Sequence, residues 1–160
     1  MASLTTIFER LKESGIQYAI VQGFSNAPRM EPKQMSILTT DAERFAKIIG
    51  AEKDADGPYL YRVPGIRTQF FLMQKGQGFF PETFETEMLR RAEIHDGVRR
   101  TNNTDTMSAR LYWMVYRESA WTQDREFRDV VVLHLERTVG CPCPPPEEMM
   151  PKHTQVPTTV

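Results

Sequence analysis

The chain has 160 residues, of which 40% are hydrophobic and 26% are charged. This length fits one domain, and this composition is typical of a soluble globular protein rather than a disordered or fibrous one. With 20 basic and 21 acidic side chains the formal net charge is −1. The chain therefore has no overall field that would attract nucleic acid or an anionic membrane.

No apolar run approaches the length of a membrane span, and the first residues lack the basic and apolar segments of a secretory signal. The two cysteines, Cys141 and Cys143, lie in the sequence CPCPP. Residues two apart rarely reach disulfide geometry, and two ligands do not complete a zinc site. We therefore expect a cytoplasmic or otherwise intracellular protein with no metal site and no cofactor.

The first fifty residues predict two helices and two strands. Apolar residues at helical spacing mark a helix over 4–14, in which Thr6 and Glu9 have capping-box spacing. The run IQYAIVQ (16–22) and the run MSILT (35–39) are typical of buried strands. Thr40, with an acid three residues later, opens a second helix that ends near Ile49.

The middle of the chain predicts a hairpin followed by a helix. Residues 59–63 and 67–74 alternate aromatic and apolar side chains around a Pro-Gly turn. The sequence KGQG (75–78) is a glycine-rich turn. The segment 81–93 has apolar residues at helical spacing, with a proline at its start and two arginines near its end.

The remaining residues predict a second hairpin and two helices. Asp96 and Gly97 are a tight-turn pair within the hairpin 93–101. A helix capped by Thr104 or Asp105 follows. For 124–140 the valine run favours a strand, whereas its length and caps favour a helix, and we expect a helix. In the first of these helices, four residues are expected to face the core: Met107, Leu111, Met114 and Val115.

This order of elements predicts an α+β domain over 1–140: a small mixed sheet with helices on one side and a helical C-terminal part. From residue 141 the composition changes, because six of the last twenty residues are prolines and no apolar periodicity remains. Residues 141–160 are therefore expected to be an extended, proline-rich tail held against the domain or a neighbouring subunit.

The sequence GIQYAIVQGFSNAP (15–28) resembles the strand and glycine turn of the nucleotidyltransferase superfold, in the minimal form of uncharacterised bacterial and large-DNA-virus proteins. QMSILTT (34–40) is similar to the family strand that carries two acids one residue apart. Residues 68–100 resemble its third strand, glycine turn and helix. The resemblance spans about 4–136. It implies a fold that binds a nucleoside triphosphate and uses acids to hold two metal ions.

The departures from this family decide the expected chemistry. The paired acids fall at Gln34 and Ser36, the third acid falls at Phe71, and the family glycine falls at Gly23. Two metal ions need anionic oxygens, but amide and hydroxyl oxygens are neutral and phenylalanine offers no oxygen. The resemblance therefore implies a degenerate site at these four positions, with no catalytic residue. For Gly23 a turn that needs a positive φ is a better explanation than a remnant of a phosphate-binding turn.

We expect a catalytically inactive nucleotidyltransferase-like domain that serves as a structural or protein-interaction subunit. One alternative is an active nucleotidyl- or glycosyl-transferase with rearranged acids at Glu31, Asp41 or Glu43, and another is an unrelated small α+β binding module. Binding of a nucleotide is weakly indicated. Candidate residual contacts for it are Ser25, Lys75, Gly76 and Gly78.

A protein partner or a homo-oligomer is the expected kind of assembly, in the cytoplasm or in a viral assembly. Nucleic acid is not expected, because acids lie close to the arginine pairs 90–91 and 99–100. Aromatic residues and arginine are enriched at interfaces, and proline-rich segments bind grooves. The interface candidates are Trp113, Tyr116, Trp121, Pro144, Pro145 and Pro146.

Overall fold

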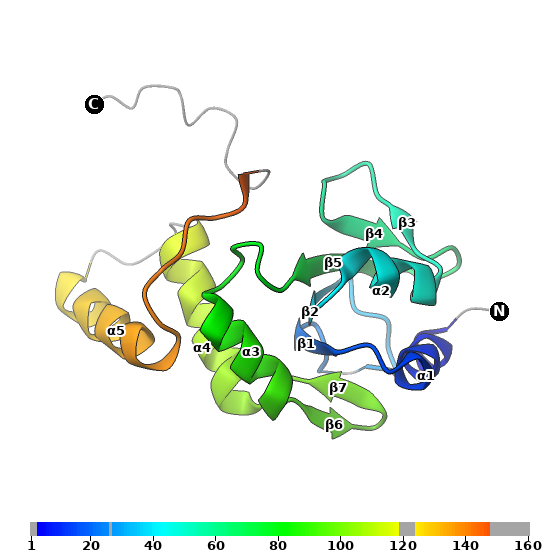
Figure 1. Ribbon diagram of the computed structural model, residues 1–160, viewed down its shortest axis with the longest axis horizontal. Coiled ribbons are helices and arrows are strands. Elements are labelled where there is room, and N and C mark those ends of the chain that lie inside the picture. The colour runs from blue at the N-terminus through cyan, green and yellow to red at the C-terminus, as the bar shows by residue number, and fades with distance from the viewer. Residues whose placement is uncertain (1–2, 26, 119–123, 148–160) are drawn as a thin grey trace.

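The computed structural model describes residues 3–25, 27–118 and 124–147. Within these ranges, seven strands form one mixed sheet in the order β3-β4-β5-β2-β1-β7-β6 (Figure 1). The strands are β1 (Tyr18–Gln22), β2 (Gln34–Thr39), β3 (Glu52–Lys53), β4 (Leu60–Arg62), β5 (Gln69–Gln74), β6 (Glu93–His95) and β7 (Val98–Arg100). The helices are α1 (Leu4–Ser14), α2 (Ala42–Ile49), α3 (Glu82–Arg91), α4 (Asn103–Trp113) and α5 (Arg125–Thr138), and a π-helical turn, η1 (Met114–Glu118), continues α4.

Three strands make the centre of the sheet. β1 is antiparallel to β2, and β2 is parallel to β5 from the pair Gln34–Gln69 to the pair Thr39–Gln74. The predicted hairpins β4–β5 and β6–β7 are present and extend the two sides of the sheet. The mixed α+β fold class is therefore confirmed.

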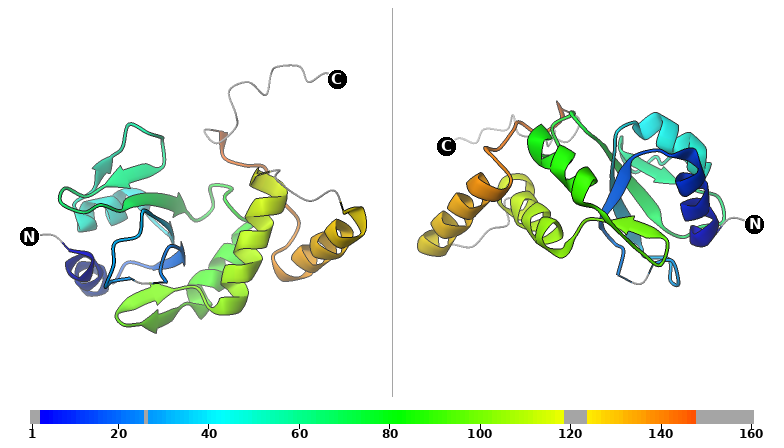
Figure 2. Two further views of the ribbon diagram at one scale, coloured as in Figure 1. Left: turned by 180° about the vertical axis from the view of Figure 1, so that it is seen from behind. Right: turned by 60° about the horizontal axis from the view of Figure 1, so that its bottom comes forward.

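Helices cover both faces of the sheet, which corrects the expectation of helices on one side. Ile37 and Leu72 face a core shared with α1 and α2. Leu38 and Met73, their neighbours along the same strands, face a second core shared with α3, α4 and α5. The two views in Figure 2 show the two groups of helices apart from each other. Because successive side chains of a strand alternate, central strands that are apolar on both faces need both layers.

The second core corrects the expected orientation of α4. Met107 is 64% exposed, although its spacing predicts a core position. Of the other three predicted core residues, Val115 is buried, and Leu111 and Met114 are half-buried. The buried face of α4 also contains Ala109 and Tyr112. The phenol of Tyr112 packs against Phe80, with ring centroids 5.5 Å apart. The buried face of α4 consists largely of small and polar residues. A pattern based on large apolar side chains therefore does not identify it.

The helix N-termini use capping side chains close to the predicted ones. Each observed cap accepts a hydrogen bond from the backbone N–H three residues later, as an N-cap does. The observed caps of α1, α2 and α4 are Ser3, Asp41 and Asn102, whereas the sequence pattern predicts Thr6, Thr40, and Thr104 or Asp105.

The described part of the tail, residues 141–147, lies against the domain. The backbone N–H of Cys143 donates to the phenol oxygen of Tyr112 at 3.1 Å. Arg117 donates from Nη2 to the carbonyl of Cys143 at 3.1 Å and to the carbonyl of Gly78 at 2.9 Å. Pro146 is buried. The guanidinium of Arg117 thus links the start of the tail to the glycine-rich turn. Residues 148–160 lie outside the described residues.

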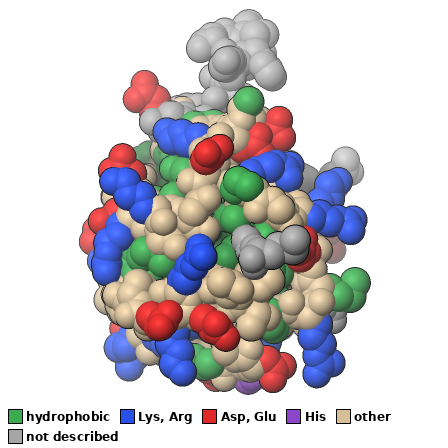
Figure 3. Space-filling view, turned by 90° about the vertical axis from the view of Figure 1, so that its right-hand side faces the viewer, with side chains coloured by type: hydrophobic (Ala, Val, Ile, Leu, Met, Phe, Trp, Pro, Cys, Tyr) green, Lys and Arg blue, Asp and Glu red, His purple; other side chains and the backbone are tan. Residues whose placement is uncertain are grey.

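The face of the molecule near α1 and α2 is mixed in charge. Figure 3 shows lysine and arginine side chains interspersed with aspartate and glutamate over the face near α1 and α2. None of the described helices has both the length and the apolar character needed to cross a membrane.

Candidate functional site

A cavity of about 340 Å³ lies between the sheet and α4. This volume falls within the usual range of small-molecule sites, about 300–1,000 Å³. The degenerate-site positions Gln34, Ser36 and Phe71 all line it. The other lining residues are Val21, Gln22, Met73, Phe80, Thr106, Ala109, Arg110, Trp113 and Glu118.

The floor of the cavity is set by the parallel register of β2 and β5. Gln34 and Ser36 are two residues apart, so their side chains point to the same face. Ser36 lies beside Phe71, and Gln34 lies beside Gln69. The Gln34 amide nitrogen Nε2 donates to Oε1 of Gln69 at 3.1 Å. The sheet therefore brings together the three positions at which the sequence resemblance places acids.

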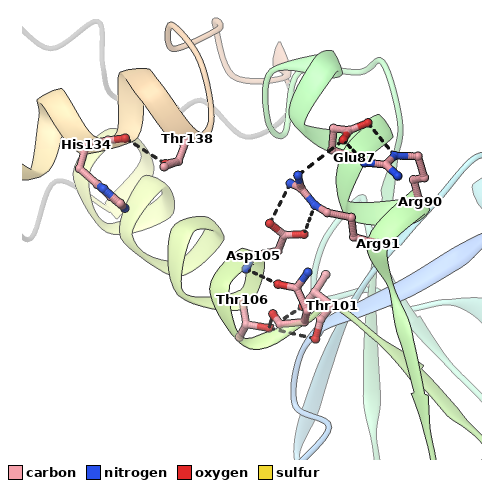
Figure 4. Close-up of polar contacts among 9 residues, drawn as sticks. Glu87, Arg90, Arg91, Thr101, Asp105, Thr106, His134 and Thr138 are labelled. Carbon is pink, nitrogen blue, oxygen red and sulfur yellow. Dashed lines mark hydrogen bonds and ion pairs between the residues drawn. The ribbon is translucent and has the colours of Figure 1, made fainter.

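The opposite wall is α4, and an ion pair holds it in place. Arg91, at the end of α3, binds both carboxylate oxygens of Asp105 in the first turn of α4, at 2.9 and 3.0 Å (Figure 4). The side chain of Asp105 is only 5% exposed. A two-point contact of this kind fixes direction as well as distance. The contact orients the face of α4 that carries Thr106, Ala109 and Trp113.

Phe71 and Trp113, which line the cavity, belong to a cluster of aromatic rings. The rings of Phe71 and Trp113 meet edge to face, with centroids 6.2 Å apart. Phe79 stacks on Trp113 and also meets Tyr59. Such ring pairs are rigid and well packed. The third acid position is thus part of an apolar cluster.

The polar groups in the cavity do not fit a catalytic metal pair. Gln34 offers a neutral amide oxygen and Ser36 a hydroxyl, and Phe71 offers no oxygen at all. Glu118 lines the cavity as well, but its carboxylate pairs with Arg110 at 3.4 Å. Among the described residues, no group of three histidine, cysteine, aspartate or glutamate side chains is placed to hold a metal ion. The described lining therefore offers one carboxylate, already paired with an arginine, where two divalent ions require several anionic oxygens.

Gly23 packs tightly against β2. Its φ is +92°, and a Cβ at this position would lie 2.4 Å from the carbonyl oxygen of Gln34 and 3.0 Å from the Cα of Met35. Only glycine fits so close to the neighbouring backbone. Gly23 is not among the residues that line the cavity. The need for close approach explains this glycine without a phosphate.

The glycine-rich turn at 75–78 uses its groups within the fold. Lys75 pairs with Glu82 at 3.2 Å, and the N–H of Gly76 donates to Oε1 of Glu85 at 2.9 Å. A Cβ on Gly78 would lie 2.8 Å from the carbonyl oxygen of Pro144. Neither this turn nor the exposed Ser25 lines the cavity. The structure therefore does not bring these four candidate contacts to Ser36.

The alternative acids do not meet at one point. Glu31 precedes β2 and accepts a hydrogen bond from the N–H of Arg67 at 2.8 Å. Asp41 follows β2 and caps α2, and Glu43 lies in the first turn of that helix. A strand of six residues separates Glu31 from Asp41, which is about 20 Å of chain. None of the three lines the cavity.

The interface candidates are placed differently from one another. Trp113 and Tyr116 are half-buried, the first in the cavity wall and the second against Tyr112, with ring centroids 4.9 Å apart. Trp121 lies outside the described residues. In the tail, Pro144 is exposed, Pro145 half-buried and Pro146 buried.

The comparisons with known proteins add a distant likeness. No protein-family model and no curated protein matches the sequence. The structure is similar to a crystal structure of the aminoglycoside nucleotidyltransferase ANT(2'')-Ia in complex with adenylyl-2''-tobramycin. The TM-score is 0.45 and the identity 11%, over 84% of this chain and 91% of that one. A similarity of this degree concerns only the path of the backbone and gives no information about a reaction or a ligand.

Three of the residues that shape this region were missed by sequence reasoning. The sequence marks Asp105 only as a candidate helix cap, and no pattern marks Arg117. Glu85 is fully buried between α3 and the glycine-rich turn. Burial raises the pKa of Glu85 to about 7, and its hydrogen bond from Gly76 partly opposes that rise. Charged residues on a helix are usually solvated, so no local signal marks the ones that a tertiary contact buries.

Proposed function

We propose that this protein is a catalytically inactive domain of nucleotidyltransferase-like fold that serves as a structural or protein-interaction subunit. The observation that carries the proposal is the convergence of Gln34, Ser36 and Phe71 on one cavity. The sequence resemblance places the acids of the active family at these three positions. An amide, a hydroxyl and a phenyl ring occupy them instead.

The chemistry of the site supports the absence of catalysis. Phosphoryl and nucleotidyl transfer depends on fixed charge that offsets the negative charge developing on the transferred group. In the described cavity the cation Arg110 is paired with Glu118. The glycine-rich turn, the other candidate phosphate contact, is occupied by Glu82, Glu85 and the tail.

The test is titration calorimetry with the four ribonucleoside triphosphates, each with magnesium or manganese, together with an assay for released pyrophosphate. We expect no pyrophosphate release and no binding that depends on the metal. Tight metal-dependent binding with turnover would overturn the proposal. A matched control is the Ser36→Ala variant, which should behave as the unmodified protein in both assays.

A further inference from the structure

Helix α5 carries an exposed apolar stripe on its outer side. Val130 is 62% exposed and Leu133 is 48% exposed, and both are among the large hydrophobic residues most open to solvent. The inner side of α5 is anchored by Val131 and Leu135, which belong to the second core. Figures 1 and 2 show α5 as the outermost helix, at the end of the molecule away from α1.

The stripe has a charge at each end. Glu126, Val130, Leu133 and Arg137 follow one another at intervals of four, three and four residues. This spacing keeps all four on one line along a helix. Glu126 and Arg137 are both exposed, and neither makes an ion pair with another described residue.

We propose that this stripe is the contact of a two-fold dimer in which α5 packs antiparallel against α5 of a second copy. In an antiparallel pair centred between Val130 and Leu133, each Val130 meets Leu133 of the other copy. The same register sets Glu126 of each copy opposite Arg137 of the other. One operation thus pairs the apolar residues with each other and the opposite charges with each other, which is the self-complementarity that a two-fold interface requires.

The charges of Glu126 and Arg137 favour a second copy of this chain as the partner of the stripe. They also favour the antiparallel direction of the two helices. A parallel pair in register would place Glu126 beside Glu126 and Arg137 beside Arg137, which is repulsive. The 14-residue helix is about 21 Å long. A contact between two such helices lies below the area of a stable obligate dimer, so the dimer is expected to be weak, with a dissociation constant of about 10–100 μM.

This inference rests on the proposed function for its role, because an interaction subunit needs a partner surface. Its test is independent, since it measures assembly and not nucleotide binding. Sedimentation velocity over a concentration series should show a monomer that converts to a dimer. A monomer at every concentration up to about 1 mM would overturn the inference, because even a weak pair would then be populated.

Charge reversal tests the register. Glu126→Arg alone and Arg137→Glu alone each create two like-charge contacts per dimer, so each should weaken self-association by about tenfold or more. Mixed in equal amounts, the two variants restore both opposite-charge contacts in a heterodimer, which should form about as well as the unmodified dimer. Failure of the mixture to associate would overturn the antiparallel register.

Four further variants test whether the dimer contact is specific to the stripe. Val130→Glu should abolish the dimer while circular dichroism stays unchanged, because the side chain is exposed. The reversals Arg125→Glu and Glu136→Arg lie off the stripe and should leave the dissociation constant unchanged. A dimer that survives Val130→Glu would place the interface elsewhere. A dimer lost on deleting residues 148–160 would assign the contact to the tail and overturn the inference.

Discussion

Ser36 on β2 lies directly beside Phe71 on β5 in the parallel register of the two strands, and both side chains line the same cavity. A paired acid at the first position and a third acid at the second would be close enough to share metal ions. Here a hydroxyl meets a ring that also packs against Tyr59, Phe79 and Trp113. Ser36 thus borders an aromatic cluster, whereas Gln34, two residues earlier on the same strand, is exposed.

Restoring the paired acids should not restore activity. In the double variant Gln34→Asp with Ser36→Asp, both side chains point into an open cavity, so the free energy of unfolding should fall by no more than about 1 kcal/mol. The third position remains a phenylalanine, and two carboxylates do not complete the site. Pyrophosphate release with manganese and a nucleoside triphosphate would show that the third position is assigned wrongly.

Gly23→Ala should be strongly destabilising. The left-handed φ costs about 1–2 kcal/mol for a residue with a Cβ, and the new Cβ would also meet the carbonyl oxygen of Gln34 at 2.4 Å. We expect a loss of about 3 kcal/mol in the free energy of unfolding, measured with denaturant.

Gly65→Ala is the matched control for that substitution, because Gly65 has a φ of +85° but nothing within 4 Å of its Cβ position. It should cost about 1 kcal/mol. Equal losses in the free energy of unfolding for the two variants would mean that the close contact with β2 contributes nothing to the effect of Gly23→Ala.

Glu85 should make stability depend on pH. Burial raises the pKa of its carboxyl group from 4.5 to about 7 in the folded protein. The folded state therefore holds a proton that the unfolded state releases. The stabilisation is complete below about pH 4.5 and is lost as the pH rises through about 7. The total change is about 3 kcal/mol in the free energy of unfolding.

Glu85→Gln should remove that dependence. Glutamine can still accept the hydrogen bond from Gly76, and it carries no charge to desolvate. Denaturant unfolding at pH 5, 6, 7 and 8 should give a flatter profile for this variant. Glu82→Gln is the control, because Glu82 is 66% exposed. A profile for Glu85→Gln as steep as that of the unmodified protein would rule out Glu85 as its cause.

Arg117 should control access to Cys143. Its guanidinium holds the carbonyls of Cys143 and Gly78 together and lies over the Tyr112 ring at 5.2 Å. In a Cys141→Ser background, Arg117→Gln should raise the rate at which a thiol reagent labels Cys143 by about tenfold, corresponding to about 1.4 kcal/mol of lost contact.

Arg110→Gln is the matched control for the labelling experiment, because Arg110 is exposed and pairs with Glu118. It should leave the rate unchanged. An unchanged rate in Arg117→Gln as well would show that other contacts hold this part of the tail.

The sequence by itself determined most of the local elements and their order, although it gave no sign of the short strand β3 or of the π-helical turn η1. Apolar spacing predicts α1 and α3, the Asp96-Gly97 pair predicts the β6–β7 turn, and the run MSILT (35–39) predicts β2. These signals act between residues close in the chain, so a single sequence contains them. The continuous apolar runs of β1 and β2 are also typical of a sheet that is covered on both faces, as the structure has it.

Only the tertiary structure decided which residues of different elements lie side by side. The parallel pairing of β2 with β5 sets Ser36 beside Phe71, and the Arg91–Asp105 contact turns Ala109 and Tyr112 inward in place of Met107. The burial of Glu85, and with it the raised pKa, comes from packing beneath the glycine-rich turn. Contacts between distant residues are set by the packing of the whole chain, and charged or small residues carry no local pattern that reveals them.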